Sequence, residues 1–406
     1  MTAQSLAPAA RSVSAAGAAG DADGTGGRGG GPAGVPLRLD DVERAAAAVL
    51  PDAVRDFVAG GSGSERTLAD NRAALDRIRV VPRALRDVSA CSAATTLLSR
   101  QVAMPVATAP IGYQKLVHPQ GELAAAAAAK AAGVPFTVGT LSSFPLEQVA
   151  AVGATTWFQL YWLRDRALSF DLVRRAEAAG CAAVMLTVDV PWMGRRLRDM
   201  SNGFALPDGV VAANFTTGTA SEAHRASPGG SALAAHTSTA FDPSLSWADL
   251  EELRRRTRLP LIVKGLLDPA DAVRAAEAGA DAVVVSNHGG RQLDGAVASA
   301  DVLEAVCAAV AGRCEVLLDS GVRSGTDVLK ALASGASGVL VGRPLLWGLA
   351  TGGAEGARGV LGLLAEEFRD ALGLAGCSGV AEARRLRVLR RASQDGTGVG
   401  EGAVWR

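Results

Sequence analysis

The sequence of 406 residues predicts an α/β protein: a (β/α)8 barrel with an N-terminal helical extension and a long loop after the fourth strand. Eight short apolar runs alternate with Ala-, Leu- and Arg-rich helical segments over roughly 250 residues, as such a barrel requires. Polar and glycine residues gather just after these runs. The rival fold, a doubly wound open sheet, would place a GxGxxG motif after its first strand, and the sequence has none there.

Composition is typical of an ordinary globular protein. The 41 basic and 41 acidic residues balance, which argues against a general nucleic-acid or acidic-membrane binder. A hydrophobic fraction of 49% is too high for a disordered chain and sufficient for a large core. The 5 cysteines form no CxxC pair, so neither a disulfide framework nor a metal site is predicted. Without a signal peptide or an apolar run of about 18 residues, we expect a cytoplasmic protein and no membrane contact.

The chain divides into one domain and two tails. Residues 1–36 contain 9 Gly and 10 Ala without any hydrophobic period, which predicts a disordered tail. A single domain is expected over 37–392, followed by a flexible tail over 393–406. The domain begins with a helix in LRLDDVERAAAAVLP, capped by Asp, and a second helix in PDAVRDFVAGG, which ends at a glycine pair.

The eight predicted strands are short β-branched or apolar runs. They span 106–109, 136–139, 156–160, 183–188, 261–263, 282–285, 315–318 and 338–341. Helical segments such as GELAAAAAAKAAG and GTDVLKALASGA separate them and end near Gly, as a left-handed C-cap would require. Between Pro191 and Trp247 about 55 residues replace a short loop. This insertion is either a lid or mobile segment or, for its small-residue middle, an excursion without a role.

Ligand-binding residue types follow the predicted strands, where a barrel enzyme has its active site. Strands 1 to 6 lead to Pro110, Ile111, Gly112, Tyr113, Gln159, Tyr161, Thr187, Asp189, Lys264, Ser286, His288 and Arg291, and Arg196 lies beyond strand 4. The loops after strands 7 and 8 carry Asp319, Ser320, Gly321, Val322, Arg323, Gly342 and Arg343. Glycines let backbone N–H groups approach an anion and arginines add charge, so these two loops predict a phosphate site. A phosphate on a cofactor fits better than one on a substrate, because the other strand ends supply separate catalytic groups.

His288 is the candidate general base. A lone histidine is more often structural, but this one lies among arginines, a tyrosine, a lysine and Asp189 on neighbouring strand ends. Such a carboxylate would orient the imidazole ring and stabilise its charged form. Arg196 and Arg291 are candidates for clamping a substrate carboxylate through forked hydrogen bonds, whereas surface arginines would carry no such role.

The stretch SNHGGRQLDG resembles the active-site signature of the FMN-dependent 2-hydroxy-acid oxidase/dehydrogenase family. The stretches ERTLADNR, APIGYQK, QLYW, LTVDVP, LPLIVKG, DSGVRSGTDVLKALASGA and VGRP add to the resemblance, which covers about residues 37–389. It implies that FMN is the cofactor. It also implies that His288 removes the α-hydroxyl proton as the α-hydrogen passes to flavin N5, supported by Asp189. Relatives of this family are commonly tetramers, so a homotetramer is expected.

The resemblance assigns the remaining site residues. Arg196 and Arg291 would hold the substrate carboxylate, Tyr161 would hydrogen-bond the substrate hydroxyl, and Lys264 would stabilise the reduced flavin. The isoalloxazine would be lined by Pro110, Ile111, Gly112, Gln159, Thr187 and Ser286, with Gly139 or Thr140 in place of a serine of relatives. The ribityl chain and phosphate would lie against Asp319, Ser320, Gly321, Val322, Arg323, Gly342 and Arg343.

Departures from the family pattern bear on substrate and electron acceptor. Phe57 replaces a second carboxylate-binding tyrosine, and Leu141 and Leu163 replace pocket aromatics. We therefore expect an (S)-2-hydroxy-acid oxidase that reduces O2 to H2O2 and acts on a bulky or aryl substrate such as mandelate or 4-hydroxymandelate, whose ring Phe57 and Tyr113 would contact. Gly112, where oxygen-reactive members usually have Ala, favours the alternative of a dehydrogenase using a quinone or protein acceptor.

Two rivals from other classes are weighed. An FMN-dependent isomerase or nucleotide dehydrogenase would share the phosphate loops but needs no His-x-x-Arg pair with a further arginine. A barrel that keeps flavin as a scaffold or sensor predicts a broken catalytic set. Here His288, Asp189, Tyr161, Lys264 and both arginines are present.

Overall fold

The computed structural model describes residues 36–215 and 239–390, so the tails predicted at 1–36 and 393–406 lie outside it apart from Pro36. Three helices open the described chain: α1 (Leu39–Val49), α2 (Asp52–Ala59) and α3 (Arg66–Arg77). The predicted aspartate cap of α1 is wrong, because the N-cap is Arg38 and its side chain makes no capping bond. Asp40 and Asp41 lie instead in the first turn, where carboxylates interact favourably with the helix dipole.

Eight parallel strands form the barrel, as predicted. They are β4 (Val106–Thr108), β5 (Phe136–Gly139), β6 (Thr156–Tyr161), β7 (Ala183–Thr187), β8 (Leu261–Leu266), β9 (Ala282–Val285), β10 (Glu315–Leu318) and β11 (Gly338–Val341). The hydrogen-bonded order is β4-β11-β10-β9-β8-β7-β6-β5, and nearly every strand residue is buried. Both faces of these strands are covered, which explains why their sequences are continuously apolar rather than alternating.

The barrel closes between β4 and β5 without a regular ladder. The backbone N–H of Thr108 donates to the carbonyl of Pro135 at 3.0 Å. The hydroxyl of Thr108 in turn accepts from the backbone N–H of Thr137 at 2.9 Å. One threonine therefore supplies both hydrogen bonds of this seam.

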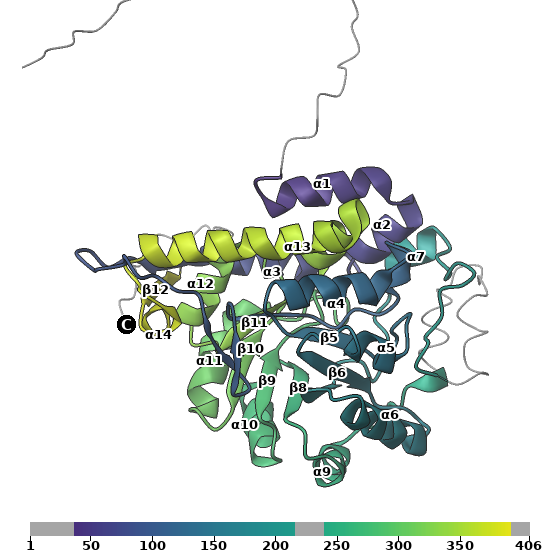
Figure 1. The fold of residues 1–406 in the computed structure, drawn as a ribbon. Helices are drawn as coiled ribbons and strands as arrows, with labels where there is room; N and C mark the ends of the chain where they lie inside the picture. The colour runs from purple at the N-terminus through teal and green to yellow at the C-terminus, as the bar shows by residue number, and fades with distance from the viewer. Residues whose placement is uncertain (1–35, 216–238, 391–406) are drawn as a thin grey trace, which may run out of the picture. The chain divides into compact units, whose positions relative to one another are not determined.

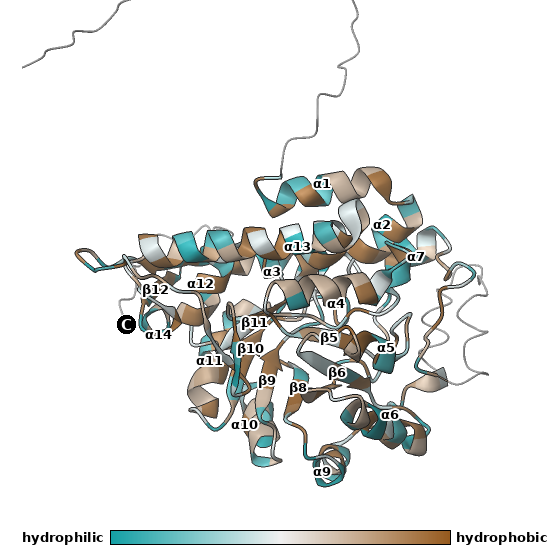
Figure 2. Ribbon diagram, viewed as in Figure 1, coloured by the Kyte–Doolittle hydropathy of each residue, from teal (hydrophilic) through white to brown (hydrophobic). Residues whose placement is uncertain are grey.

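Helices cover the outside of the strands (Figure 1). They are α4 (Gly121–Ala131), α5 (Leu146–Ala150), α6 (Arg166–Ala178), α9 (Trp247–Arg256), α10 (Pro269–Glu277), α11 (Ser299–Val310), α12 (Gly325–Ala333) and α13 (Arg343–Leu374). Figure 2 shows hydrophobic residues along β8 and β9 and polar residues on α6 and α9. The predicted left-handed glycines are confirmed at Gly133 and Gly335, with φ of +65° and +103°, just past the C-caps of α4 and α12.

Two small antiparallel sheets were not predicted. β1 (Ile78–Val81), which follows α3, pairs with β12 (Arg387–Arg390) at the C-terminal end of the described chain. β2 (Thr95–Leu97) pairs with β3 (Arg100–Val102), and Leu97 and Val102 belong to the same apolar cluster as the barrel-interior residue Trp157. The cluster also contains Leu98, Ala107, Ala182, Ala183, Met185, Ile262, Ala282, Val284, Leu317 and Leu340. The barrel interior is thus a packed core rather than a pore.

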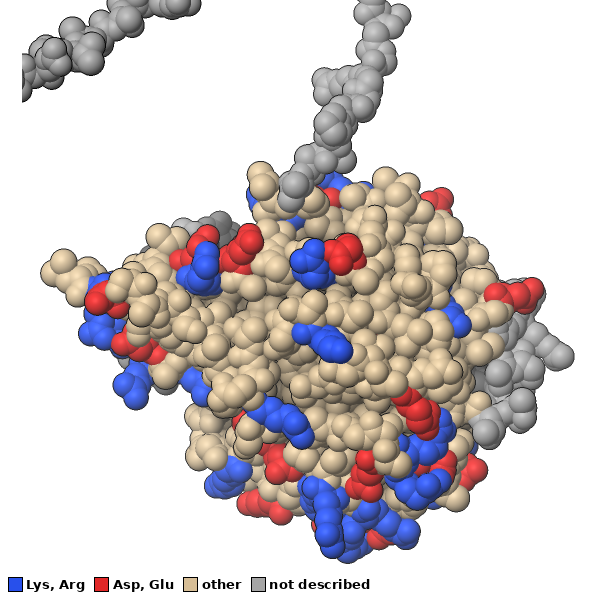
Figure 3. Space-filling model, in the orientation of Figure 1, with Lys and Arg blue, Asp and Glu red and all other residues tan. Residues whose placement is uncertain are grey.

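Many charged side chains on the outer surface lie next to an opposite charge. Figure 3 shows blue and red side chains adjoining over α6 and α9. Arg174 pairs with Asp171 there, and Glu252 accepts from Arg255 and Arg256 at 2.7 Å each. Among the described residues, none of the helices combines the length and apolar character needed to cross a membrane.

Candidate active site

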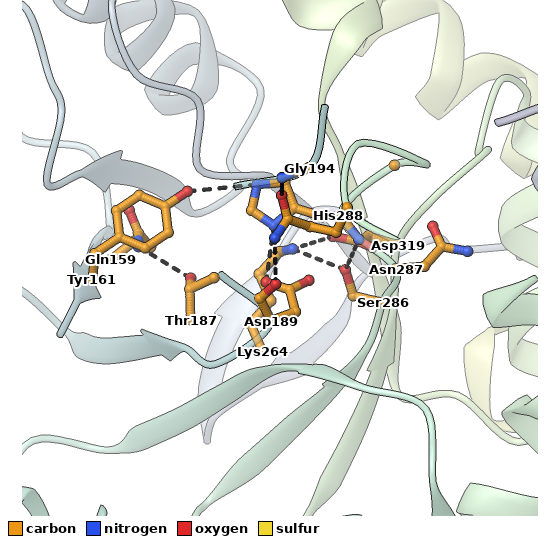
Figure 4. A network of polar contacts seen from close by, with 12 residues as sticks. Gln159, Tyr161, Thr187, Asp189, Gly194, Lys264, Ser286, Asn287, His288 and Asp319 are labelled. Carbon is orange, nitrogen blue, oxygen red and sulfur yellow. Dashed lines mark hydrogen bonds and ion pairs between the residues drawn. The ribbon is translucent and has the colours of Figure 1, made fainter. Parts of the chain in front are cut away.

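His288 lies at the mouth of the barrel between Asp189 and Tyr161 (Figure 4). Its Nδ1 is 2.9 Å from Asp189 Oδ1, and its Nε2 is 3.5 Å from the Tyr161 hydroxyl. Because a carboxylate accepts hydrogen bonds, this pairing places a proton on Nδ1 and leaves the Nε2 lone pair available. His288 and Asp189 follow β9 and β7, and Tyr161 ends β6, so the strand ends at one edge of the barrel bring together groups that are far apart in sequence.

Ser286 fixes the loop after β9 through the hydrogen bonds of its hydroxyl. The Ser286 hydroxyl accepts from the His288 backbone N–H at 3.0 Å and from Lys264 Nζ at 2.9 Å. His288 has a left-handed backbone with φ of +60°, an uncommon conformation for a residue with a side chain. Lys264 also pairs with Asp319 Oδ2 at 3.0 Å, so one hydrogen-bonded chain links β8 to the loops after β9 and β10.

Burial and charge set the protonation states of these groups. Burial lowers the pKa of His288 below its usual value, and the Asp189 carboxylate opposes that shift only in part. Burial acts to raise the pKa of Asp189, but His288 and Lys264 outweigh it and hold this pKa below its usual range. Burial raises the pKa of Tyr161 to about 12, so its hydroxyl stays protonated and can donate. A neutral imidazole beside an ionised carboxylate is the arrangement that a general base needs.

Arg196 and Arg291 meet over the ring of Phe57. Their guanidinium carbons lie 5.9 Å and 5.1 Å from the ring centroid. Arg291 donates to the carbonyls of Phe57 and Gly60, both at 2.8 Å, and neither arginine forms an ion pair within the described chain. Burial lowers the pKa of Arg291 well below its usual value, and the positive charges of Arg196 and Arg343 lower it further. A carboxylate bound here would relieve that repulsion.

The loops after β10 and β11 form the opposite end of the site. Arg343 donates to the carbonyls of Val58, Gly60 and Gly289 at 2.8 to 3.1 Å. Arg323 lies 4.8 Å from the ring of Trp347, and neither guanidinium forms an ion pair within the described residues. Burial lowers the pKa of Arg323 to about 10 and that of Arg343 to about 9. Two such guanidinium groups create a strong preference for an anion between them.

A cavity with about 1070 Å³ of empty space, counted out to its open mouth, joins the two ends. Most predicted site residues line it: Phe57, Pro110, Ile111, Gly112, Tyr113, Tyr161, Arg196, Lys264, His288, Arg291, Asp319, Ser320, Gly321, Val322, Arg323, Gly342 and Arg343. Five predicted residues do not line it: Asp189, Thr140, Gln159, Thr187 and Ser286. They lie behind the lining and bond to one another or to lining residues.

Comparisons with known proteins agree with this geometry. Residues 46–390 match the family described as FMN-dependent dehydrogenase. The chain belongs to this family. Its sequence is 59% identical to a 4-hydroxymandelate oxidase of Amycolatopsis orientalis, over 86% of the chain and 97% of the relative. It is 48% identical to an L-lactate oxidase of Nostoc, over 84% of the chain and 95% of the relative.

Solved structures of this family are also similar to the chain. A mandelate oxidase crystallised with (S)-4-hydroxymandelic acid superimposes with a TM-score of 0.85 at 58% identity, covering 87% of this chain and 99% of that one. A second mandelate oxidase structure gives a TM-score of 0.82 at 56% identity, with 87% and 98% covered. The barrel predicted from the sequence is therefore confirmed.

The residues present fit FMN, the cofactor of this family. Arg323 and Arg343, which form no ion pair within the described residues, supply positive charge at the end where a phosphate is predicted. Lys264 is 3% exposed, and although burial acts to lower its pKa, Asp319 and Asp189 raise it, so it stays charged. Gly112 leaves no room for a side chain, since an added Cβ would lie 2.8 Å from the Cβ of Leu141. The strand end therefore keeps a flat backbone surface beside the cavity.

Ser320 keeps its side chain between the loops after β9 and β10. Its hydroxyl donates to Asp319 Oδ1 at 2.8 Å and accepts from the Gly289 backbone N–H at 3.0 Å. The backbone φ of +73° is one that favours glycine. The two hydrogen bonds explain how a serine is tolerated there.

Sequence reasoning missed Phe241, Met193 and Val190, which line the cavity. Phe241 stacks on Tyr161 with ring centroids 4.4 Å apart. The predicted pocket role of Leu163 is not supported, because Leu163 lies outside the lining and forms a β-bridge with Phe241. Phe241 belongs to the end of the long insertion, whose sequence has no period that could have placed it at the site. Part of the predicted small-residue stretch of that insertion lies outside the described residues.

Proposed function

We propose that this protein catalyses the FMN-dependent oxidation of an (S)-2-hydroxy acid to the 2-oxo acid, with an aryl substrate such as mandelate or 4-hydroxymandelate. The observation that carries the proposal is His288, paired with Asp189 behind it, in one cavity with two arginines that form no ion pair among the described residues. A hydroxy acid needs both features, a base for its hydroxyl proton and cations for its carboxylate. Similarity to a 4-hydroxymandelate oxidase supports the aryl class.

In this proposal each side chain has one task. Arg196 and Arg291 bind the carboxylate, and the Tyr161 hydroxyl donates to the α-hydroxyl oxygen. The free Nε2 of His288 accepts the hydroxyl proton, and Asp189 stabilises the imidazolium that forms. Bound FMN supplies the two-electron acceptor chemistry. Lys264 provides positive charge where negative charge develops on reduction.

Apolar lining favours an aromatic substrate. Tyr113, Leu141, Met193 and Phe241 line the cavity together with Phe57, which lies under both arginines. Leu141 is smaller than the aromatic residue that the family pattern places there, which leaves volume for a ring. A hydrophobic wall of this kind favours mandelate over glycolate by the burial of the ring.

The alternative is a dehydrogenase that passes electrons to a quinone or protein acceptor instead of O2. The feature that suggested it, Gly112, has an independent structural reason, because an added Cβ would lie 2.9 Å from the carbonyl oxygen of Leu141. A glycine is needed here for packing whatever the acceptor is. Reduction of O2 to H2O2 is therefore the acceptor reaction that we favour.

Anaerobic mixing of the holoenzyme with (S)-mandelate, (S)-4-hydroxymandelate, lactate or glycolate tests both the substrate class and the electron acceptor. We expect the aryl acids to bleach the flavin fastest, and readmitted air to restore its colour with formation of H2O2. Faster bleaching by glycolate would contradict the aryl substrate, and colour that returns only with a quinone would favour the dehydrogenase. We also propose that the protein is a cytoplasmic homotetramer. Light scattering of the purified protein measures the mass of the assembly and so tests the number of subunits.

A further inference from the structure

The two carboxylate-binding arginines are held in different ways. Arg291 is tied to the C-terminal end of α2 by hydrogen bonds to the Phe57 and Gly60 carbonyls. Arg196 has no such bonds: its Nη2 contacts Met193 Sδ at 3.3 Å, and its buried Nε has no partner among the described residues. Arg196 is the N-cap of the short helix α7 (Leu197–Ser201), so its position depends on where α7 lies.

An aromatic stack joins α7 to α2. Phe204, just after α7, stacks on Phe57 with ring centroids 4.6 Å apart and planes at 10°. Phe204 is buried and lies outside the cavity lining, and its backbone N–H donates to the Asp199 carbonyl at 2.8 Å. Phe57 contacts Phe204 and also lies near both guanidinium groups. Phe204 therefore holds in place the ring against which the two arginines pack.

A cluster of polar contacts outside the cavity also joins α7 to α2. Arg198 pairs with Glu65 and lies 3.8 Å from Asp56 Oδ1. Asn202 donates to Asp56 Oδ2 at 3.2 Å. Asp56 directly precedes Phe57, and the Glu65 carboxylate also accepts from the Gly61 backbone N–H at 2.9 Å. These contacts connect α7 to the segment that holds Arg291.

The positive charges of Arg196 and Arg291 repel each other, and the polar contacts of Arg198 oppose this repulsion. Arg196 and Arg291 are like charges without an ion-pair partner in the described chain, so in the absence of a bound carboxylate they tend to separate. Among the described residues the buried Asp199 forms no ion pair with either guanidinium group and offsets their repulsion only from a longer distance. A restraint on α7 from outside the cavity keeps the separation of the two arginines suited to one carboxylate.

We propose that Arg198 is a positioning residue for substrate binding: its contacts with Glu65 and Asp56 hold α7 on α2 and so set the spacing of Arg196 and Arg291. Arg198 touches neither the cavity nor any group assigned to the reaction. The inference rests on the proposed function, because it presupposes that the two arginines bind a substrate carboxylate.

The test compares the holoenzyme with Arg198→Gln, Arg198→Lys and the control Arg358→Gln, which removes an exposed pair with Glu355 on α13. The measurements are KM and kcat for (S)-mandelate, and the Kd of phenylacetate from the change in the visible spectrum of FMN. We expect Arg198→Gln to raise KM and Kd about three- to fivefold with kcat nearly unchanged, as loss of a surface ion cluster allows. Arg198→Lys should show a smaller rise and Arg358→Gln none.

Unchanged Kd and KM in Arg198→Gln would overturn the inference. If this variant folds poorly or loses FMN, Glu65→Gln provides the test, because it removes the carboxylate that pairs with Arg198 and keeps an acceptor for the Gly61 backbone N–H. A similar rise in Kd supports the inference, and an unchanged Kd overturns it. A wild-type protein that neither oxidises (S)-mandelate nor binds phenylacetate contradicts the proposed function instead.

Discussion

His288 shows how the environment of a single residue determines its chemistry. Its ring is held by Asp189 on one side and faces Tyr161 on the other, and its backbone is fixed by Ser286. Burial keeps the imidazole neutral, while the adjacent carboxylate makes proton uptake during the reaction less costly. The same histidine on an open surface would have neither property.

Replacing His288 by Ala should lower kcat for mandelate by about 10²- to 10⁴-fold, because the proton acceptor is lost. The yellow flavin should remain bound, since the residues at the phosphate end of the cavity are untouched. Steady-state kinetics and the visible spectrum measure both. The control is His118→Ala, a histidine outside the cavity lining, which should keep full activity. Colourless protein would mean that His288 instead supports the cofactor.

The pH dependence of kcat/KM should show an acid limb below pH 6.5, the ordinary value for histidine, because the pKa of His288 is lowered. The base works only when neutral, so activity falls as the pH drops through this pKa. Asp189→Asn removes a charge that raises the pKa, so the limb should move to lower pH while kcat falls from loss of ring orientation. A limb that moves to higher pH would contradict the assignment of His288.

At the scale of elements, strand ends were predictable and the insertion was not. The apolar runs of β9 and β10 predict where His288 and Asp319 lie, because neighbouring parallel strands end at the same edge. Nothing in the sequence period predicts that α7 stacks on α2 or that Phe241 covers Tyr161. Those contacts join segments that tertiary packing alone brings together.

In helix α13, two glycine-to-alanine substitutions should change the free energy of unfolding in opposite directions. Gly359 is exposed, with no atom within 4 Å of an added Cβ, whereas a Cβ on Gly356 would lie 2.1 Å from the Gly348 carbonyl oxygen. Gly359→Ala should therefore stabilise the protein by about 0.5–1 kcal/mol through helix propensity. Gly356→Ala should destabilise it by about 1–3 kcal/mol through overpacking. Thermal unfolding of the two holoenzymes measures the difference, and equal Tm values would contradict this account.

At the scale of the whole molecule, the sequence was sufficient for the barrel and for most of the cavity lining. Alternating apolar and helical segments dictate the architecture, since a sheet buried on both faces has few alternatives. The pairing of β1 with β12 was not predictable, because these two four-residue strands lie some 300 residues apart along the chain. Their register depends on the completed barrel between them.

Removing FMN should lower Tm, because Arg323 and Arg343 then face each other without an anion. Added FMN should restore Tm in a concentration-dependent way. At 100 times Kd, the free energy of unfolding should rise by about 2.7 kcal/mol. Riboflavin, which has the same ring but no phosphate, is the matched control and should restore less. Equal restoration by riboflavin would show that the two arginines do not hold a phosphate.

The seam at Thr108 has a consequence for how the molecule adapts. Opening a full ladder such as β6–β7 breaks a run of paired residues, whereas β4 and β5 are joined by two hydrogen bonds from one threonine. The loops that carry Tyr113 and Leu141 follow these two strands. Because few hydrogen bonds join these strands, we expect a substitution here to alter the width of the ring-binding wall more readily than one in a full ladder. Substitutions near Thr108 therefore offer a route to new substrate side chains without loss of the fold.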